Sequence, residues 1–82
     1  MPNSHQFIQA TEIVKTLNIK DSETLGRLYG LYKQAIFGDN NTNKPAIYDI
    51  RNFTKWNYWT SYKGLTVYNA ECQYINLVNT LL

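Results

Sequence analysis

The feature that most constrains the fold is an amphipathic stretch over residues 22–37, which is ended by Gly38. At the helical repeat of about 100° per residue, its apolar and tyrosine side chains share one broad stripe. The stripe consists of Leu25, Leu28, Tyr29, Leu31, Tyr32, Ala35 and Ile36. Arg27, Gly30 and Gln34 lie on the opposite side, which an amphipathic helix turns to solvent. This stretch therefore predicts a helix that buries one face.

Lys33 lies at the margin of this stripe, one turn after Tyr29 and beside Tyr32. A cation between two phenols at the rim of an apolar face suits a ligand that has an anionic head and an apolar part. An ordinary amphipathic helix with amphipathic side chains on its margin gives the same pattern. The spacing alone favours this second interpretation.

The composition predicts a folded, single-domain protein over residues 1–82. Apolar residues make up 44 % of the chain and charged residues 17 %, which excludes the intrinsically disordered class. The net charge of +2 permits an anionic partner without requiring one. One cysteine, Cys72, excludes an internal disulfide and a cysteine-based metal cluster. The first residues do not resemble a signal peptide and no apolar run approaches a transmembrane length, so we expect a cytoplasmic protein without stable membrane insertion.

Start and stop signals predict four helices. Ser4 can cap the first helix and Thr66 the fourth, because their hydroxyl oxygens can accept bonds from the free N–H groups of a first turn. Either Asp21 or Ser22 can cap the second helix in the same way. Residues 1–4 are expected to fray. The expected helices cover residues 5–18, 22–37, 53–62 and 67–82.

A long loop over residues 38–49 joins the second and third helices. It is rich in turn-forming residues, contains Pro45, and is longer than the usual connection of about 4–6 residues. Ile47, Tyr48 and Ile50 indicate that part of it packs. Because no segment alternates with period two, we expect an all-α fold: a four-helix bundle with a long loop between its second and third helices.

The sequence offers little for catalysis, so we expect a protein that is not an enzyme. Its one histidine, His5, lies at the N-terminal end of the chain, and its six carboxylates are scattered. It contains neither a phosphate-binding glycine motif nor the spacing of zinc ligands. We therefore expect no metal and no cofactor.

The aromatic content is unusual, with seven tyrosines, two tryptophans and three phenylalanines, several of them close to basic residues. A tyrosine in an apolar stripe is most often part of a core. Several tyrosines with interleaved lysines make a site that stacks a purine and pairs with a phosphate more plausible. Trp56 and Trp59, three residues apart, are expected to pack in the core. The candidate residues are Tyr29, Tyr32 and Lys33 on the second helix, Arg51 and Lys55 around the start of the third, and Tyr74 on the fourth.

A series of blocks in a fixed order resembles the acyl-CoA-binding protein family. The blocks are Tyr29-Gly30-Leu31-Tyr32-Lys33-Gln34-Ala35, Gly38-Asp39, Pro45, Lys55-Trp56, Trp59, Lys63-Gly64, Ala70 and Tyr74, with Phe7, Ala10, Val14 and Leu17 fitting the first helix. The resemblance covers nearly the whole chain. It implies a four-helix bundle with a long overhanging loop. It also implies an intracellular carrier and pool former that binds medium- to long-chain fatty acyl-CoA esters without chemistry.

The resemblance also implies roles for individual residues. Tyr29, Lys33 and Lys55 would hold the 3′-phosphate of the nucleotide. Tyr32 would contact the adenine, and Tyr74 the adenine and ribose. The rest of the site would be lined by Thr11, Lys15, Leu25 and Arg51.

Three positions depart from the family pattern. Gly26 stands where the family commonly has a larger apolar residue, which affects the shape of the acyl groove. A glycine inside a helix costs about 1 kcal/mol relative to alanine, so Gly26 also indicates close packing. Phe53 replaces a frequent lysine, and Thr11 replaces a usual alanine beside the groove.

Two other functions compete with the acyl-CoA carrier. A small helical nucleic-acid-binding module would use the mildly basic, aromatic composition, but the eight Lys and Arg residues are spread along the chain and form no basic stripe. A protein-interaction module would use the aromatic surface, but it leaves the pairing of tyrosines with lysines unexplained. We therefore expect a monomer that binds acyl-CoA and no nucleic acid.

Overall fold

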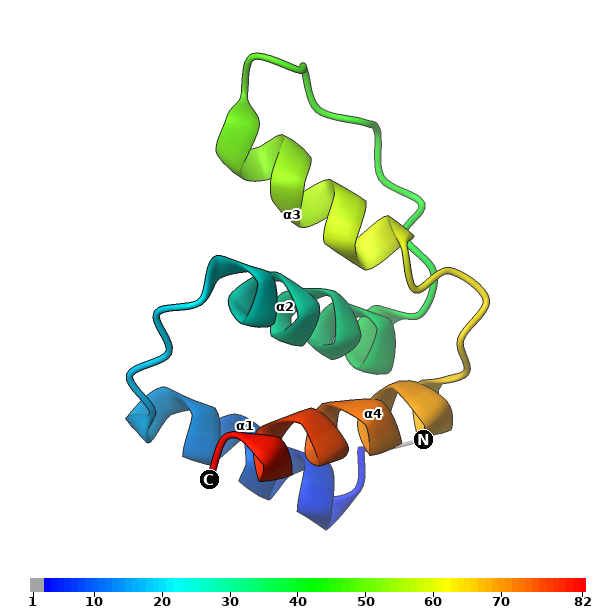
Figure 1. Ribbon diagram of the computed structural model, residues 1–82. Coiled ribbons are helices and arrows are strands. Elements are labelled where there is room, and N and C mark those ends of the chain that lie inside the picture. Colours follow the sequence, from blue (N-terminus) through cyan, green and yellow to red (C-terminus); the bar gives the residue numbers. More distant parts are fainter. Residues whose placement is uncertain (1–2) are drawn as a thin grey trace.

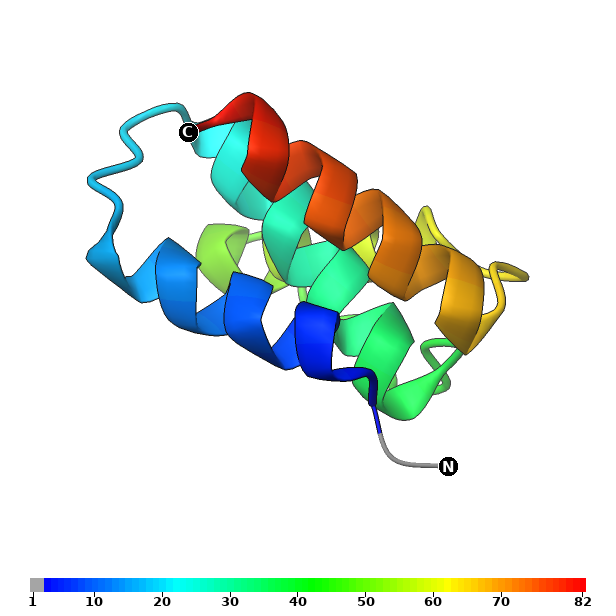
Figure 2. The same ribbon diagram turned by 90° about the horizontal axis from the view of Figure 1, so that it is seen from below.

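The computed structural model describes residues 3–82, which form four helices and no strand (Figure 1). They are α1 (His5–Thr16), α2 (Ser22–Phe37), α3 (Ile50–Thr60) and α4 (Val67–Thr80). α2 is the central element, with α3 on one side and the layer of α1 and α4 on the other (Figures 1 and 2). The prediction of an all-α, four-helix fold with a long α2–α3 loop is confirmed.

Side-chain caps begin three of the helices. The Ser4 hydroxyl accepts from the N–H of Phe7 at 3.2 Å, and the Thr66 hydroxyl accepts from the N–H of Asn69 at 3.1 Å. At the second helix the cap is Asp21 and not Ser22, because the Asp21 carboxylate accepts from the N–H of Thr24. These caps satisfy N–H groups that a first turn leaves unpaired.

The third helix lies earlier in the chain than expected. It begins at Ile50 because the Asp49 carbonyl already accepts from the N–H of Phe53 at 2.9 Å, one turn ahead of the expected start. It ends at Thr60 because the next bonds span three residues, as in the bond from the N–H of Lys63 to the Thr60 carbonyl. α1 and α4 each end two residues earlier than expected, at Thr16 and Thr80.

The main core lies between α2 and the layer of α1 and α4 (Figure 2). Trp59 is buried separately, on the α3 side of α2. The helix α2 is therefore covered on two sides, and the expectation that Gly30 and Gln34 face solvent is wrong, since both are buried. Arg27 is exposed as expected. The buried core residues are Phe7, Ala10, Leu28, Leu31, Ala35, Ala70, Tyr74, Leu77 and Val78.

Buried Gln34 joins the end of α2 to the turn between α3 and α4. Its Nε2 donates to Asp39 Oδ1 and to the Leu65 carbonyl, each at 2.8 Å. The same Asp39 oxygen accepts from the N–H of Gly64 at 2.8 Å. The bonds from Gly64 and Gln34 stabilise the carboxylate and hold the pKa of Asp39 below its usual value. Gly38 and Gly64 flank this network with positive φ angles of 79° and 91°, which favour glycine.

The segment before α1 is more ordered than expected. Asn3 Nδ2 donates to the Ala35 carbonyl at 3.0 Å and to Glu71 Oε2 at 2.6 Å. The N–H of Ser4 also donates to the buried Glu71 carboxylate. The predicted fraying is therefore wrong for Asn3 and Ser4, and Met1 and Pro2 lie outside the described residues.

Two glycines allow α2 and α3 to approach closely. A Cβ added at Gly30 would lie 2.6 Å from the Tyr58 carbonyl oxygen, which is closer than real Cβ atoms come. A Cβ added at Gly26 would overlap the ring of Tyr58. The expectation of close packing at Gly26 is confirmed, and Gly30 extends the contact by one helical turn.

Both indole N–H groups attach the loop 38–49 to α3. Trp59 Nε1 donates to the Gly38 carbonyl at 2.8 Å, and Trp56 Nε1 donates to the Thr42 carbonyl at 3.1 Å. The far part of the loop is not packed as expected, because Ile47, Tyr48 and the following Ile50 are all exposed.

Replacing Trp59 by Ala should destabilise the protein by about 3–5 kcal/mol, because a buried indole and its bond to the loop are lost. Trp56→Ala should cost clearly less, because Trp56 is only half-buried. Urea unfolding followed by circular dichroism measures both values. Equal losses for the two variants would contradict this ranking.

Candidate binding site

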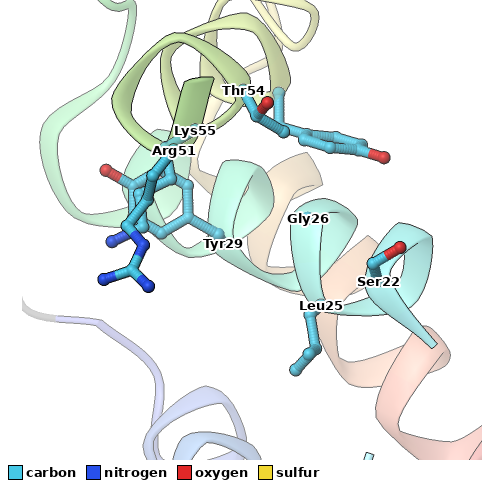
Figure 3. Close-up of a pocket in the computed structure, with 8 residues that line it drawn as sticks. Ser22, Leu25, Gly26, Tyr29, Arg51, Thr54 and Lys55 are labelled. Carbon is cyan, nitrogen blue, oxygen red and sulfur yellow. The ribbon is translucent and has the colours of Figure 1, made fainter. Parts of the chain in front are cut away.

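A hollow of about 550 Å³ lies between α2 and α3 (Figure 3). Most of its surface is apolar. The α3 residues recur every three or four positions, so they share one face of that helix. The hollow is lined by Ser22, Leu25, Gly26 and Tyr29 from α2, and by Arg51, Thr54, Lys55 and Tyr58 from α3.

A second hollow, of about 260 Å³, shares Tyr29 and Lys55 with the first. We call the first the α2–α3 hollow and the second the loop hollow, because the 38–49 loop forms part of its wall. Tyr29 and Lys55 therefore lie where the two hollows meet. The other residues that line the loop hollow are Lys33, Thr42, Asn43, Pro45, Asn52, Trp56 and Trp59.

Two cations face the Tyr29 ring from different helices. Lys33 Nζ lies 5.9 Å from the centre of this ring, and Lys55 Nζ lies 5.5 Å from it. Within residues 3–82 the only ion pair joins Lys15 to Glu12, so neither lysine is paired with a described carboxylate. This arrangement concentrates positive charge at the junction of the hollows and can attract an anion.

Aromatic rings also position Lys33. Its ammonium lies 4.6 Å from the centre of the Phe37 ring and 5.2 Å from that of Trp59. Each ring face attracts a cation. These rings therefore hold the Lys33 charge in place beside the loop hollow.

The rings of Tyr32 from α2 and Tyr74 from α4 lie close together. Their ring centres are 6.5 Å apart, and Phe7 packs against both, at 6.1 Å from Tyr32 and 5.1 Å from Tyr74. Tyr32 is 40 % exposed, whereas Tyr74 is only 4 % exposed. Burial, and secondarily the proximity of Tyr32, raises the pKa of Tyr74 to about 12.

The structure brings together most of the residues that the sequence proposed. Tyr29, Lys55, Leu25 and Arg51 line the α2–α3 hollow, and Lys33 lines the loop hollow. Figure 3 shows Tyr29, Arg51 and Lys55 grouped at one end and Ser22 at the other.

Four proposed residues line neither hollow: Tyr32 and Tyr74, and the two on α1, Thr11 and Lys15. Lys15 pairs with Glu12 at 3.2 Å and is exposed. The Thr11 hydroxyl donates to the Ile8 carbonyl at 2.7 Å. Neither lines the α2–α3 hollow or the loop hollow.

The sequence interpretation missed Tyr58 and Thr54 as lining residues. A usable signal was present, because Arg51, Lys55 and Tyr58 follow the four-then-three spacing of one helical face. The expected helix start after Asn52 left Arg51 outside the helix and concealed this face.

Comparisons with known proteins agree with this geometry. A family model described as Acyl CoA binding protein matches residues 4–78. This chain belongs to the acyl-CoA-binding protein family. The resemblance drawn from the sequence is therefore confirmed.

Several family members are similar over most of their length. The Drosophila melanogaster acyl-CoA-binding protein homolog is 42 % identical over 81 residues, covering 96 % of this chain and 93 % of that protein. The Caenorhabditis elegans acyl-CoA-binding protein homolog 1 is 40 % identical over 77 residues, covering 93 % of this chain and 90 % of that protein. The crystal structure of Oryza sativa Acyl-CoA-Binding Protein 2 superposes with a TM-score of 0.89 at 35 % identity, covering 93 % of this chain and 86 % of that one.

Two further observations concern the described part of this family member. No helix within residues 3–82 is long and apolar enough to cross a membrane. The same residues contain no group of three or more His, Cys, Asp or Glu side chains that could hold a metal ion.

Replacing Tyr74 by Phe should alter stability only at alkaline pH. The pKa of Tyr74 is raised from 10.0 to about 12, so its contribution is fully present below pH 10 and is lost as the pH rises towards 12. Phenylalanine cannot ionise, so the free energy of unfolding of Tyr74→Phe should fall less than that of wild type over this range. Urea unfolding at a series of pH values gives both curves.

The matched control is Tyr48→Phe, which alters a tyrosine that is 89 % exposed and should follow the wild-type curve. Parallel curves for wild type and Tyr74→Phe would show that the Tyr74 hydroxyl does not titrate differently in the folded state.

Proposed function

We propose that this protein binds medium- to long-chain fatty acyl-CoA esters and serves as their carrier and pool former. The observation that carries this proposal is the meeting of an apolar hollow and a cation-lined hollow at Tyr29 and Lys55. An acyl-CoA ester has the matching shape, with an apolar tail and an anionic nucleotide head. Similar proteins named for acyl-CoA binding support the proposal.

The head group would be held by Tyr29, Lys33 and Lys55 through the 3′-phosphate. Two unpaired ammonium groups near one ring repel each other in the empty protein, and a dianionic phosphate would relieve this repulsion. Hydrogen bonds to charged groups are worth about 1.5–3 kcal/mol each. The Tyr29 hydroxyl can add a further donor to the same group.

The nucleotide base would lie against Tyr32, whose exposed ring can stack on a purine. Tyr74 would contact the adenine and ribose through its hydroxyl. Thr11 and Lys15 would approach the ligand from α1, across the bundle from α3.

The acyl tail would occupy the α2–α3 hollow, in contact with Leu25, with Arg51 beside Tyr29 and Lys55 at one end. Each methylene that leaves water contributes about 0.8 kcal/mol. The mechanism is sequestration, in which the fold shields the tail and no bond of the ligand changes.

We also propose that the chain acts in the cytoplasm as a monomer, as one domain over residues 1–82. It would catalyse no reaction, need no cofactor and bind no nucleic acid. Membership in a family of binding proteins supports these points. The comparisons favour the acyl-CoA interpretation over a nucleic-acid-binding or protein-interaction module.

Tight binding should need both ends of the ligand. In calorimetric titrations, palmitoyl-CoA should bind far more tightly than free palmitate or free CoA, with one ligand per chain, because each fragment occupies only one hollow. A short single-stranded oligonucleotide tests the nucleic-acid alternative. Equal affinity for palmitate and palmitoyl-CoA, or tight binding of the oligonucleotide, would overturn the proposal.

Removing the 3′-phosphate should weaken binding to wild type by at least about tenfold, because at least one charged hydrogen bond is lost. The measurement compares palmitoyl-CoA with palmitoyl-dephospho-CoA. The difference should shrink in Lys33→Ala and in Lys55→Ala. The matched control is Lys20→Ala, an exposed lysine outside both hollows, which should discriminate as wild type does. If both site variants keep the full difference, these lysines do not recognise the phosphate.

A further inference from the structure

The ring of Tyr58 packs on α2 at Gly26. A Cβ at Gly26 would overlap three atoms of the Tyr58 ring, so the ring occupies the space that any larger residue at position 26 would need. The ring is only half-buried, and its remaining surface faces the α2–α3 hollow. Gly26 and Tyr58 thus form a complementary pair.

Tyr58 also lines a second hollow beside the α2–α3 hollow of about 550 Å³. This second hollow has a volume of about 300 Å³ and is lined by Thr54, Asn57, Tyr58 and Ser61. Tyr58 and Thr54 line both. Of these two side chains the tyrosine is the larger, so shortening it would open the most space where the two hollows share their lining.

The position of Tyr58 relative to the charged end determines where along the hollow a bound chain would meet its ring. Along α2, Gly26 lies one turn from Tyr29, on the side away from Lys33. Along α3, Tyr58 lies one turn beyond Lys55. Figure 3 shows Tyr29 and Lys55 together at one end of the hollow, with Gly26 farther along α2. An apolar chain that starts at Tyr29 and Lys55 therefore meets the Tyr58 ring after passing along α2.

We propose that Tyr58, packed on Gly26, narrows the acyl-chain hollow before its Ser22 end and sets the longest chain that this protein buries completely. This inference rests on the proposed binding of acyl-CoA and adds a residue that determines chain-length specificity. Up to the limit, each added methylene leaves water and strengthens binding by up to about fourfold. Beyond it, added methylenes stay in water or force the chain to bend, so affinity stops rising.

The test is a titration of saturated acyl-CoA esters of increasing chain length, kept below the concentrations at which the longer esters form micelles. Wild type should show rising affinity that levels off at one length. Tyr58→Ala removes the ring that packs over Gly26 and lines both hollows, so its plateau should move to longer chains. Tyr58→Phe keeps the ring and should level off where wild type does.

A second truncation keeps the test decisive if Tyr58→Ala does not fold. Tyr58→Leu retains an apolar side chain on Gly26 but removes the outer part of the ring, so its plateau should lie beyond that of wild type. The matched control is Tyr68→Ala on α4, an exposed tyrosine outside both hollows, whose profile should equal that of wild type.

The packing itself has a test that needs no ligand. Gly26→Ala should lower the melting temperature of wild type, because the new methyl group displaces the Tyr58 ring. In the Tyr58→Ala background the same change should raise the melting temperature, because alanine favours a helix and the space is free. Equal effects in both backgrounds would show that the two residues are not coupled.

The outcomes separate this inference from the function on which it rests. If wild type binds no acyl-CoA ester, the proposed function fails. If wild type binds the esters but Tyr58→Ala and Tyr58→Leu level off at the same length as wild type, acyl-CoA binding stands and the role of Tyr58 is overturned.

Discussion

The close contact between α2 and α3 is the constraint on which the rest of the structure depends. At Gly30 the backbone of α2 comes so near to the Tyr58 carbonyl that even a methyl group has no room. This contact fixes the distance between the helices, and therefore the width of the α2–α3 hollow. It also brings Lys33 and Lys55 to the same aromatic ring from two helices. Two glycines that weaken α2 as an isolated helix thus make the binding geometry possible.

Local signals predicted much of the fold. Ser4 and Thr66 were recognisable as caps because a hydroxyl beside a first turn acts through bonds that span three residues. The burial of Gln34 could not be predicted in the same way. A polar side chain on the second face of a helix is buried only if another element covers that face, and here the bonds to Asp39 and Leu65 compensate for its burial.

The candidate site shows the same difference between contacts within one helix, which the sequence predicts, and contacts between helices, which it does not. Lys33 and Tyr29 are one turn apart, so their proximity follows from helix geometry. Lys55 was linked to them by the resemblance to a family, since no spacing rule connects residues on two different helices. Tyr58 was missed, although it follows Arg51 and Lys55 at the spacing of one helical face. Its packing on α2 depends on Gly26, which departs from the family pattern, and no spacing rule connects these two residues on different helices. The ligand contacts of all nine candidate residues stay predictions.

The two indole bonds to the loop have a kinetic consequence. Trp56 and Trp59 hold the Thr42 and Gly38 carbonyls in place before any ligand arrives, so the wall of the loop hollow is already formed. A binding surface that is preorganised loses little conformational entropy on association. It also removes a slow ordering step, so the encounter rate can follow diffusion and electrostatic attraction to the unpaired lysines. Differences in affinity among ligands should then arise mainly from how quickly each one leaves.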